Sequence, residues 1–386
     1  MNNDLSFTNK RKTIISLALT LTVIAGLLAI ASFFDLQISR ILTKGSLKVG
    51  EYISSSGFAL FFEAVGSSPL YLMVSLAGVI VFWFGVRLDK KMIVRVIVTF
   101  VGAVMVIAGF YLTFSDIFEY VGAFVGQKLT AEGATDVLIE NAEELMGSLY
   151  IDAICLVMAA VSALALISLW KRVKKEDNEK YIWWSLAIVC TVAFYLIVHF
   201  IKSPIGRVRF RAMHYLESTA LGKEAFDLYT PWYVINGKRK LWDVAGASET
   251  NTLYNFVSDA CKSFPSGHTF SAGMVYTLLA LPYLNKKFAT KKARATLWAV
   301  TICYTAIVAI SRIVAGAHYM SDVLVGGSLS FGGAMITREI FVCRGLHFKQ
   351  LFGKKKELVP VSAETATSNE EVETSVADET TESENN

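Results

Sequence analysis

Lys10-Arg11-Lys12 is followed by the apolar stretch TIISLALTLTVIAGLLAIASFF, which covers residues 13–34. An uncharged run of this length can cross the hydrocarbon core of a bilayer as an α-helix, which takes about 20 residues. The basic triplet resembles the start of a signal peptide, but the run is longer than a signal-peptide core and no small-residue cleavage site follows it. We therefore expect residues 13–34 to be a retained first membrane span.

Seven more apolar runs lie downstream, at residues 69–87, 92–114, 148–170, 181–201, 267–285, 295–314 and 321–343. The run at 267–285 is short and is broken by Pro282. A patch at 58–65 contains Glu63 and is too brief to cross, so we interpret it as interfacial or re-entrant. Hydrophobic residues make up 54% of the 386 residues and charged residues 18%, which is typical of a polytopic membrane protein. We predict an all-α transmembrane bundle of about eight spans.

Positive charge falls on every second connection of this predicted bundle. Lysine and arginine gather before the first run and after the second, fourth, sixth and eighth runs, at 10–12, 87–91, 171–175, 286–294 and 344–356. The connection between the third and fourth runs is acidic instead. Because cytoplasmic loops retain lysine and arginine, we expect both termini in the cytoplasm. The compact loops favour a plasma membrane.

The composition excludes several other classes of protein. No basic face with interleaved aromatic residues is visible, so we expect no nucleic-acid partner. The five cysteines are scattered without a CxxC pair, which argues against a zinc site or a disulfide framework. The tail 346–386 is rich in Glu, Ser and Thr and poor in aromatics, so we expect it to be cytoplasmic and disordered.

Three polar clusters fall at the outer ends of the last four runs. The connection 202–266 begins with Lys202 and ends at Pro265-Ser266-Gly267-His268; the seventh run ends at Ser311-Arg312; and the eighth begins near His318. On the predicted topology all three lie at the same membrane face. Unrelated residues would rarely meet that constraint, so we expect the three clusters to form one site.

The types of residue in these clusters suit a phosphate group. Lys202, Arg209 and Arg312 are three cations for an anion that carries up to two charges. Ser266 offers a hydroxyl group, and Gly267 allows backbone N–H groups to approach the phosphate oxygens closely. We expect these five residues to bind phosphate.

Two histidines and one carboxylate supply the reactive groups. His268 falls at the start of a predicted helix, whose positive end favours an anion. His318 and Asp322 are four residues apart and share a face if that segment is helical, so the carboxylate can hold the imidazole in one tautomer. His318 is then a candidate nucleophile, and His268 a candidate acid for the leaving alkoxide.

The spacing of these residues resembles a known family. The segments Lys202-(six residues)-Arg209, Pro265-Ser266-Gly267-His268 and Ser311-Arg312-(five residues)-His318-(three residues)-Asp322 are similar to the three motifs of the type 2 phosphatidic acid phosphatase (PAP2) superfamily. The second and third segments match in full. The first departs, because Phe210 stands where the family usually has proline, and Arg207 and Arg211 leave the register of the binding arginine open.

The resemblance implies an enzyme in which His318 attacks phosphorus, Asp322 orients His318 and His268 protonates the leaving group. It implies that phosphate is held by Lys202, Arg209, Ser266, Gly267 and Arg312, and that no metal or cofactor takes part. We divide the chain into an N-terminal membrane region (1–170), a PAP2-like catalytic core (171–345) and the acidic tail (346–386). The usual family core has six helices, so the N-terminal length is interpreted as a peripheral addition.

Three functions are compatible with these residues. The first is a lipid phosphatase that works through a phosphohistidine at the extracytoplasmic face, on phosphatidic acid, phosphatidylglycerol phosphate or a polyprenyl pyrophosphate. The second is a phosphotransferase with the same histidine step and an acceptor other than water. The third is a transporter or non-catalytic scaffold, against which the two complete motifs argue. Nothing in the sequence selects the head group or indicates the oligomeric state.

Overall fold

The computed structural model describes residues 10–48, 50–131, 149–218, 221–241 and 259–343. The chain up to Gly345 forms one compact unit. The predicted disordered tail 346–386 lies outside the described residues, as do most of the acidic connection before the fourth predicted span and residues 242–258. Within the described ranges all regular structure is helical, as predicted.

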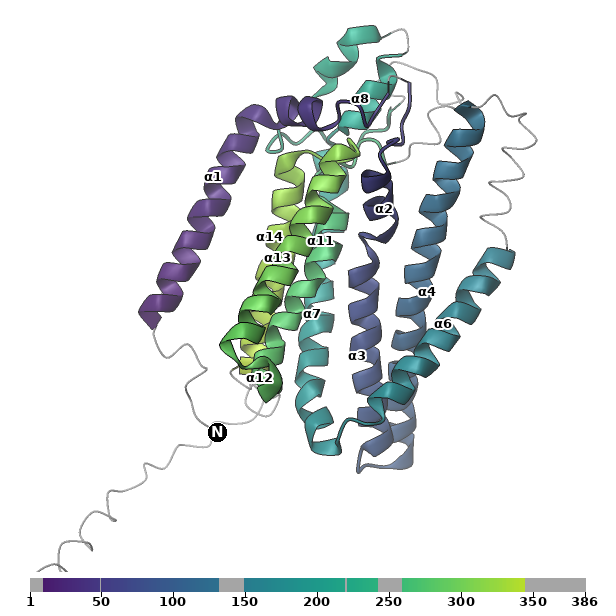
Figure 1. Ribbon diagram of the computed structural model, residues 1–386, viewed down its shortest axis with the longest axis vertical. Coiled ribbons are helices and arrows are strands. Elements are labelled where there is room, and N and C mark those ends of the chain that lie inside the picture. Colours follow the sequence, from purple (N-terminus) through teal and green to yellow (C-terminus); the bar gives the residue numbers. More distant parts are fainter. Residues whose placement is uncertain (1–9, 49, 132–148, 219–220, 242–258, 344–386) are drawn as a thin grey trace, which may run out of the picture. The chain divides into compact units, whose positions relative to one another are not determined.

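The longer helices run roughly alongside one another as a bundle (Figure 1). They are α1 (Lys10–Leu42), α3 (Ser68–Arg87), α4 (Met92–Ala131), α6 (Leu149–Trp170), α7 (Lys175–Ile205), α13 (Lys291–Val314) and α14 (Met320–Thr337). Shorter helical elements join or extend them: α2 (Gly57–Val65), α8 (Phe210–Leu216), η1 (Gly222–Leu228), α11 (Gly267–Gly273), η2 (Met274–Ala280), α12 (Leu281–Leu284), η3 (Lys286–Phe288) and η4 (Arg338–Cys343).

Six stretches of the described chain are long and apolar enough to cross a membrane. They correspond to the first five predicted spans and the seventh. The sixth, predicted at 267–285, is no single α-helix: it is built from α11, the 3₁₀ segment η2 and α12, which begins next to Pro282. The eighth, at 321–343, consists of α14 and the π-helical turn η4. Both of these segments pack inside the bundle against α7 and α13.

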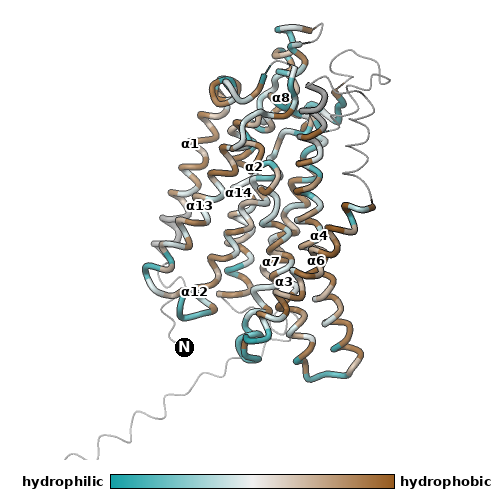
Figure 2. The backbone as a smooth tube through the Cα atoms, turned by 45° about the vertical axis from the view of Figure 1, so that its right-hand side comes forward, coloured by the Kyte–Doolittle hydropathy of each residue, from teal (hydrophilic) through white to brown (hydrophobic). Residues whose placement is uncertain are grey.

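Large apolar side chains cover the outside of the bundle. Phe33 on α1, Phe100 on α4 and Leu164 on α6 are all more than 60% exposed. The hydrophobic colouring of Figure 2 follows these helices along most of their length and gives way to polar residues at the turns. Such a surface is unfavourable in water and favourable against lipid tails.

Small residues allow the inner helices to approach closely. A Cβ atom added to Gly85 of α3 would lie 2.5 Å from the backbone nitrogen of Thr99 on α4. One added to Gly102 of α4 would lie 2.3 Å from the backbone nitrogen of Phe82. Close contact through glycine is a common way for transmembrane helices to pack, and it fixes α3 and α4 as one pair.

Helices from both predicted membrane regions share one apolar core. Ile80 of α3 and Val106 of α4 are buried in the same cluster as Ile188 of α7 and Phe270 of α11. The N-terminal region therefore packs directly on the helices that carry the three motifs.

The two ends of the bundle differ in chemistry. The basic connections α3–α4 and α6–α7 lie at one end, and α2, α8, the start of α11 and the start of α14 lie at the other (Figure 1). The polar clusters identified in the sequence belong to this second end. Helix α2 precedes α3 there as a separate short helix, and it carries the buried Glu63.

Candidate active site

Lys202 lies in the last turn of α7, and a glycine ends this helix. Gly206 adopts φ +57, and its N–H donates to the carbonyl oxygen of Lys202. A left-handed residue at this position is a common helix stop and favours glycine. The chain then turns into the segment 207–211, whose three arginines all become buried.

His318 lies in the connection between α13 and α14 and is 1% exposed. Its Nδ1 is 2.6 Å from the carbonyl oxygen of Ser263 and 3.6 Å from Oδ2 of Asp322. Because a carbonyl oxygen only accepts, Nδ1 carries the proton and the lone pair of the neutral ring is on Nε2. The pKa of His318 is lowered to about 3, because burial and the nearby Arg209 and Lys202 together outweigh the opposing effect of Asp322. The imidazole is therefore neutral at neutral pH.

Asp322 reaches His318 through a helix cap. Helix α14 begins at Met320, so His318 precedes it and the predicted shared helical face does not form. Instead, Oδ2 of Asp322 accepts from the backbone N–H of Tyr319 at 2.9 Å, which caps the helix, and from the hydroxyl of Ser263. The other oxygen, Oδ1, accepts from Arg207 at 2.6 Å. Asp322 thus lies beside His318, with a local geometry that differs from a shared helical face.

The Ser266–His268 segment forms the start of α11, as predicted. Ser266 is the N-cap, and its Oγ accepts from the backbone N–H of Thr269 at 3.3 Å. A Cβ added to Gly267 would lie 3.4 Å from Nζ of Lys202. The start of α11 therefore lies within van der Waals contact of the lysine.

His268 is held from two sides by helices of the N-terminal region. Its Nε2 is 3.1 Å from the carbonyl oxygen of Glu63 on α2, so Nε2 donates and Nδ1 is left to exchange a proton. The ring of Tyr120 on α4 contacts it edge-on, with ring centroids 5.4 Å apart.

Arg312 has hydrogen-bonding capacity that the described residues do not use. It is 1% exposed, and its Nη2 donates to Oε1 of Glu63 at 3.0 Å. Its Nε and Nη1 are buried without a partner among the described residues, as is Oε2 of Glu63. A buried donor without an acceptor is energetically unfavourable. An anion with several oxygens would supply the acceptors that Nε and Nη1 of Arg312 lack.

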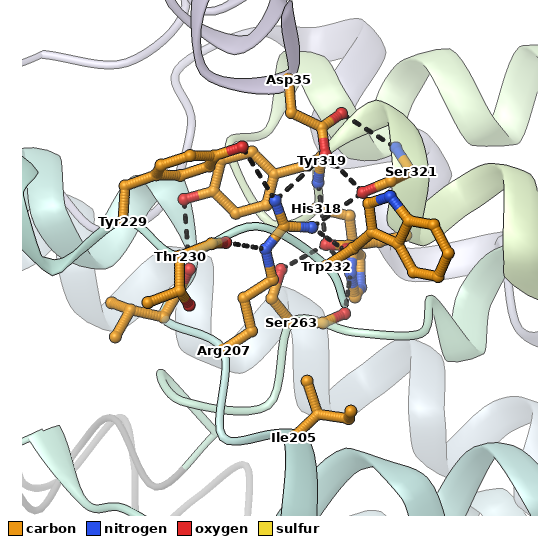
Figure 3. A network of polar contacts seen from close by, with 12 residues as sticks. Asp35, Ile205, Arg207, Tyr229, Thr230, Trp232, Ser263, His318, Tyr319 and Ser321 are labelled. Atoms are coloured by element: carbon orange, nitrogen blue, oxygen red, sulfur yellow. Dashed lines mark hydrogen bonds and ion pairs between the residues drawn. The ribbon is translucent and has the colours of Figure 1, made fainter. Parts of the chain in front are cut away.

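The three arginines of segment 207–211 pair with three different carboxylates. Arg207 contacts Asp322 and Asp35 of α1 (Figure 3). Arg209 forms an ion pair of 2.6 Å with Asp259, and Arg211 one of 2.8 Å with Glu63.

These pairings bear on which arginine of segment 207–211 is placed to bind phosphate, a choice that the sequence left open. Burial would raise the pKa of Asp259, but Arg209, Arg211 and Lys202 outweigh burial and hold it below its usual range. Asp259 is therefore ionised. Arg209 and Lys202 are the cations that act on the pKa of His318, whereas Arg207 is committed to two buried carboxylates.

Several site residues were missing from the sequence-based prediction. Asp35, Glu63 and Tyr120 come from the N-terminal region, and Asp259 and Ser263 come from the connection before α11. The interpretation of the N-terminal length as peripheral is therefore wrong for α1, α2 and α4. A carboxylate at a membrane-buried position is a recognised signal of function, and Glu63 in its apolar patch carried that signal.

A comparison with protein families finds a match over the part of the chain that carries the three clusters. Residues 183–344 match the PAP2 superfamily. The chain thus carries a PAP2 domain, which extends from α7 to the end of η4 and contains all eight residues predicted for the site. Asp35, Glu63 and Tyr120 lie outside that domain.

Two curated relatives match part of this chain. A lipid A 1-phosphatase of Rhizobium etli is 33% identical over 92 residues, which is 23% of this chain and 34% of the relative. A phosphatidylglycerophosphatase B of Bacillus subtilis is 34% identical over 79 residues, which is 19% of this chain and 36% of the relative. The chain thus spans about a third of the length of each relative. No solved structure matches the chain.

Proposed function

We propose that this chain is an integral membrane phosphatase that hydrolyses a lipid phosphate monoester or pyrophosphate through a phosphohistidine. Candidate substrates are phosphatidic acid, phosphatidylglycerol phosphate and a polyprenyl pyrophosphate. The observation that carries the proposal is the state of His318: its Nδ1 donates to Ser263, and its Nε2 lone pair lies in a site with Arg209 and Lys202. The names of the two partial relatives, both lipid phosphatases, point to the same class of substrate.

The first chemical step transfers the phosphoryl group to the protein. Nε2 of His318 attacks phosphorus and the bond from phosphorus to the lipid oxygen breaks. In this step His268 starts as the imidazolium, with protons on both ring nitrogens, and the leaving oxygen takes the proton from its Nδ1. Asp322 and the carbonyl of Ser263 stabilise the positive charge that the imidazole of His318 acquires. Arg312, Arg209 and Lys202 stabilise the charge on the phosphoryl oxygens.

The second step returns His318 to its starting state. A water molecule attacks the phosphohistidine and gives a proton to Nδ1 of His268, which is now neutral. The bond between Nε2 of His318 and phosphorus breaks, and inorganic phosphate leaves. Each step uses one proton on His268, so the cycle closes without a cofactor.

The site is proposed to face the extracytoplasmic side. The basic connections α3–α4 and α6–α7 lie at the opposite end of the bundle, and basic loops are retained in the cytoplasm. A site at the membrane boundary suits a substrate whose tail stays in the bilayer while its phosphate enters the cation cluster.

Phosphate release from a panel of lipid phosphates tests the chemistry. Purified protein in detergent, with EDTA present, should release phosphate and form an acid-labile phosphoprotein. His318→Ala should abolish both, while the control His199→Ala, at an exposed histidine of α7, should behave as wild type. Loss of activity in EDTA, or turnover by His318→Ala, would contradict the mechanism. A phosphoprotein that releases no phosphate until an alcohol acceptor is added would favour the phosphotransferase.

Orientation is tested on the same protein in intact cells. A membrane-impermeant thiol reagent should label Lys238→Cys, at an exposed residue of the site end, and should leave Lys90→Cys unlabelled until the cells are opened. The reverse pattern would place the site in the cytoplasm.

A further inference from the structure

A buried chain of charged groups links the nucleophile to the first helix of the protein. Arg207 lies between two carboxylates, with Nη1 2.6 Å from Oδ1 of Asp322 and Nη2 3.0 Å from Oδ2 of Asp35. The side chains of all three residues are 0% exposed. Figure 3 shows the guanidinium at the centre of this network, with Asp35 on one side and His318 on the other.

Further contacts fix the guanidinium in one position. Its Nε donates to the carbonyl oxygen of Thr230 at 2.8 Å, and its Cζ lies over the ring of Tyr319, 4.0 Å from the centroid. Ser321 joins the two carboxylate regions: its hydroxyl donates to Asp35 and accepts from Nη1 of Arg207, and its backbone N–H donates to Asp35 at 3.0 Å. A guanidinium with this many partners has little freedom to leave.

The two oxygens of Asp322 have separate tasks. Oδ1 is occupied by Arg207, whereas Oδ2 is shared by the groups that face the nucleophile, namely the hydroxyl of Ser263, the backbone N–H of Tyr319 and Nδ1 of His318. Arg207 therefore sets the plane of the carboxylate. The strength of the electrostatic interaction between Asp322 and His318 therefore depends on the strength of the ion pair between Arg207 and Asp322.

Asp35 governs that balance because it competes for the same cation. With both carboxylates ionised, one guanidinium charge is divided between them, and Asp322 keeps more of its charge for His318. If Asp35 is made neutral, Arg207 pairs with Asp322 alone. The carboxylate then stabilises a positively charged imidazole less well, since hydrogen bonds to a charged acceptor weaken as its charge is neutralised.

We propose that Asp35 and Arg207 are positioning residues of the nucleophile, which act on His318 through Asp322. The first helix, which lies outside the PAP2 domain, is then part of the catalytic apparatus. This inference rests on the proposed function, in which His318 attacks phosphorus.

A double-mutant cycle separates this role from a merely structural one. Asp35→Asn keeps the shape of the side chain and one acceptor oxygen, and it should lower the rate of phosphate release roughly ten-fold. In an Asp322→Asn background the same substitution should have no further effect, because the carboxylate through which Asp35 acts is gone. Equal loss in both backgrounds, or no loss in either, would overturn the proposal.

A second readout works without substrate. Diethyl pyrocarbonate modifies a neutral imidazole at its lone pair, and mass spectrometry reports the rate at His318 alone. Asp35→Asn should slow this modification when Asp322 is present and leave it unchanged in Asp322→Asn. If the wild type hydrolyses no lipid phosphate, the proposed function fails, while this cycle still decides the link from Asp35 to His318.

Control variants address folding. Ser39→Ala removes a buried hydroxyl from the next turn of α1, where it has no hydrogen-bond partner among the described residues, and should match the wild type in both readouts. If Asp35→Asn does not fold, Ser321→Ala removes the hydroxyl that joins Asp35 to Arg207 and should give a smaller loss with the same dependence on Asp322. Wild-type behaviour of Ser321→Ala would then count against the proposal.

Discussion

Glu63 offers the sharpest test of how the site is held together. Its Oε1 accepts from Arg211 at 2.8 Å and from Arg312 at 3.0 Å, and the three side chains are between 1% and 7% exposed. Glu63→Gln removes the charge and keeps the size of the side chain. Because breaking a buried ion pair costs about 3–5 kcal/mol and glutamine retains one acceptor, we expect a loss of about 3 kcal/mol in the free energy of unfolding.

The loss should be partly reversed by phosphate. In the variant two buried guanidinium groups lack a counter-ion, so inorganic phosphate should bind more tightly than in the wild type. A ligand at 100 times its dissociation constant stabilises a protein by about 2.7 kcal/mol. Denaturant unfolding in mild detergent, with and without phosphate, should therefore show a larger phosphate-dependent shift for Glu63→Gln than for the wild type.

Glu51→Gln is the matched control. Glu51 is half-buried and pairs with the exposed Lys48 at 3.6 Å, and ion pairs at the surface contribute about 0–1 kcal/mol. This variant should unfold near the wild type and respond to phosphate as the wild type does. If Glu63→Gln unfolded at the wild-type midpoint, or if phosphate stabilised both proteins equally, the pairing of Glu63 with the two arginines would not contribute as argued.

Two further predictions concern protonation and packing. Because the pKa of His318 is lowered to about 3, its lone pair is present above that pH and is lost only below it. Phosphoprotein formation from an aryl phosphate that needs no acid should therefore stay constant between roughly pH 5 and 8, where a free histidine titrates near 6.5; a fall centred near 6.5 would contradict this. Gly326→Ala would place a Cβ 2.3 Å from the carbonyl oxygen of Ser266, so it should lower both thermal stability and activity. Gly332→Ala on the same helix meets nothing within 4 Å and should change neither; equal behaviour of the two variants would refute the packing argument.

The apolar runs predicted the bundle because the bilayer sets a length that a sequence displays directly. The run at 267–285, which is the least regular of them in the structure, is the one that contains a proline. Pro282 lacks a backbone N–H, and the run around it folds as short α and 3₁₀ pieces. The glycines of α14 instead allow close contacts, as where Gly326 meets Ser266.

The predicted site residues gather at one end because the motifs fix spacing around helix ends. What the sequence could not indicate was the source of the counter-ions. Asp35 and Glu63 reach the site only through tertiary contacts over 172 and 249 positions of sequence, to Arg207 and Arg312 respectively. No local periodicity encodes such a pairing. The contact of Ser263 with His318 was equally hidden, because it uses a backbone carbonyl that any residue type provides.

The position of Asp35 also bears on how the protein is made. Helix α1 precedes the other described helices in the chain, yet its carboxylate finds its partners only at Arg207 and Ser321. Until those segments enter the bilayer, α1 carries a charge near one end without its cation, which is unfavourable in lipid. The pairing of Asp35 can therefore be completed only after Arg207 and Ser321 have been synthesised. A chain that ends before Arg207 lacks the cation that pairs with Asp35 in the folded protein.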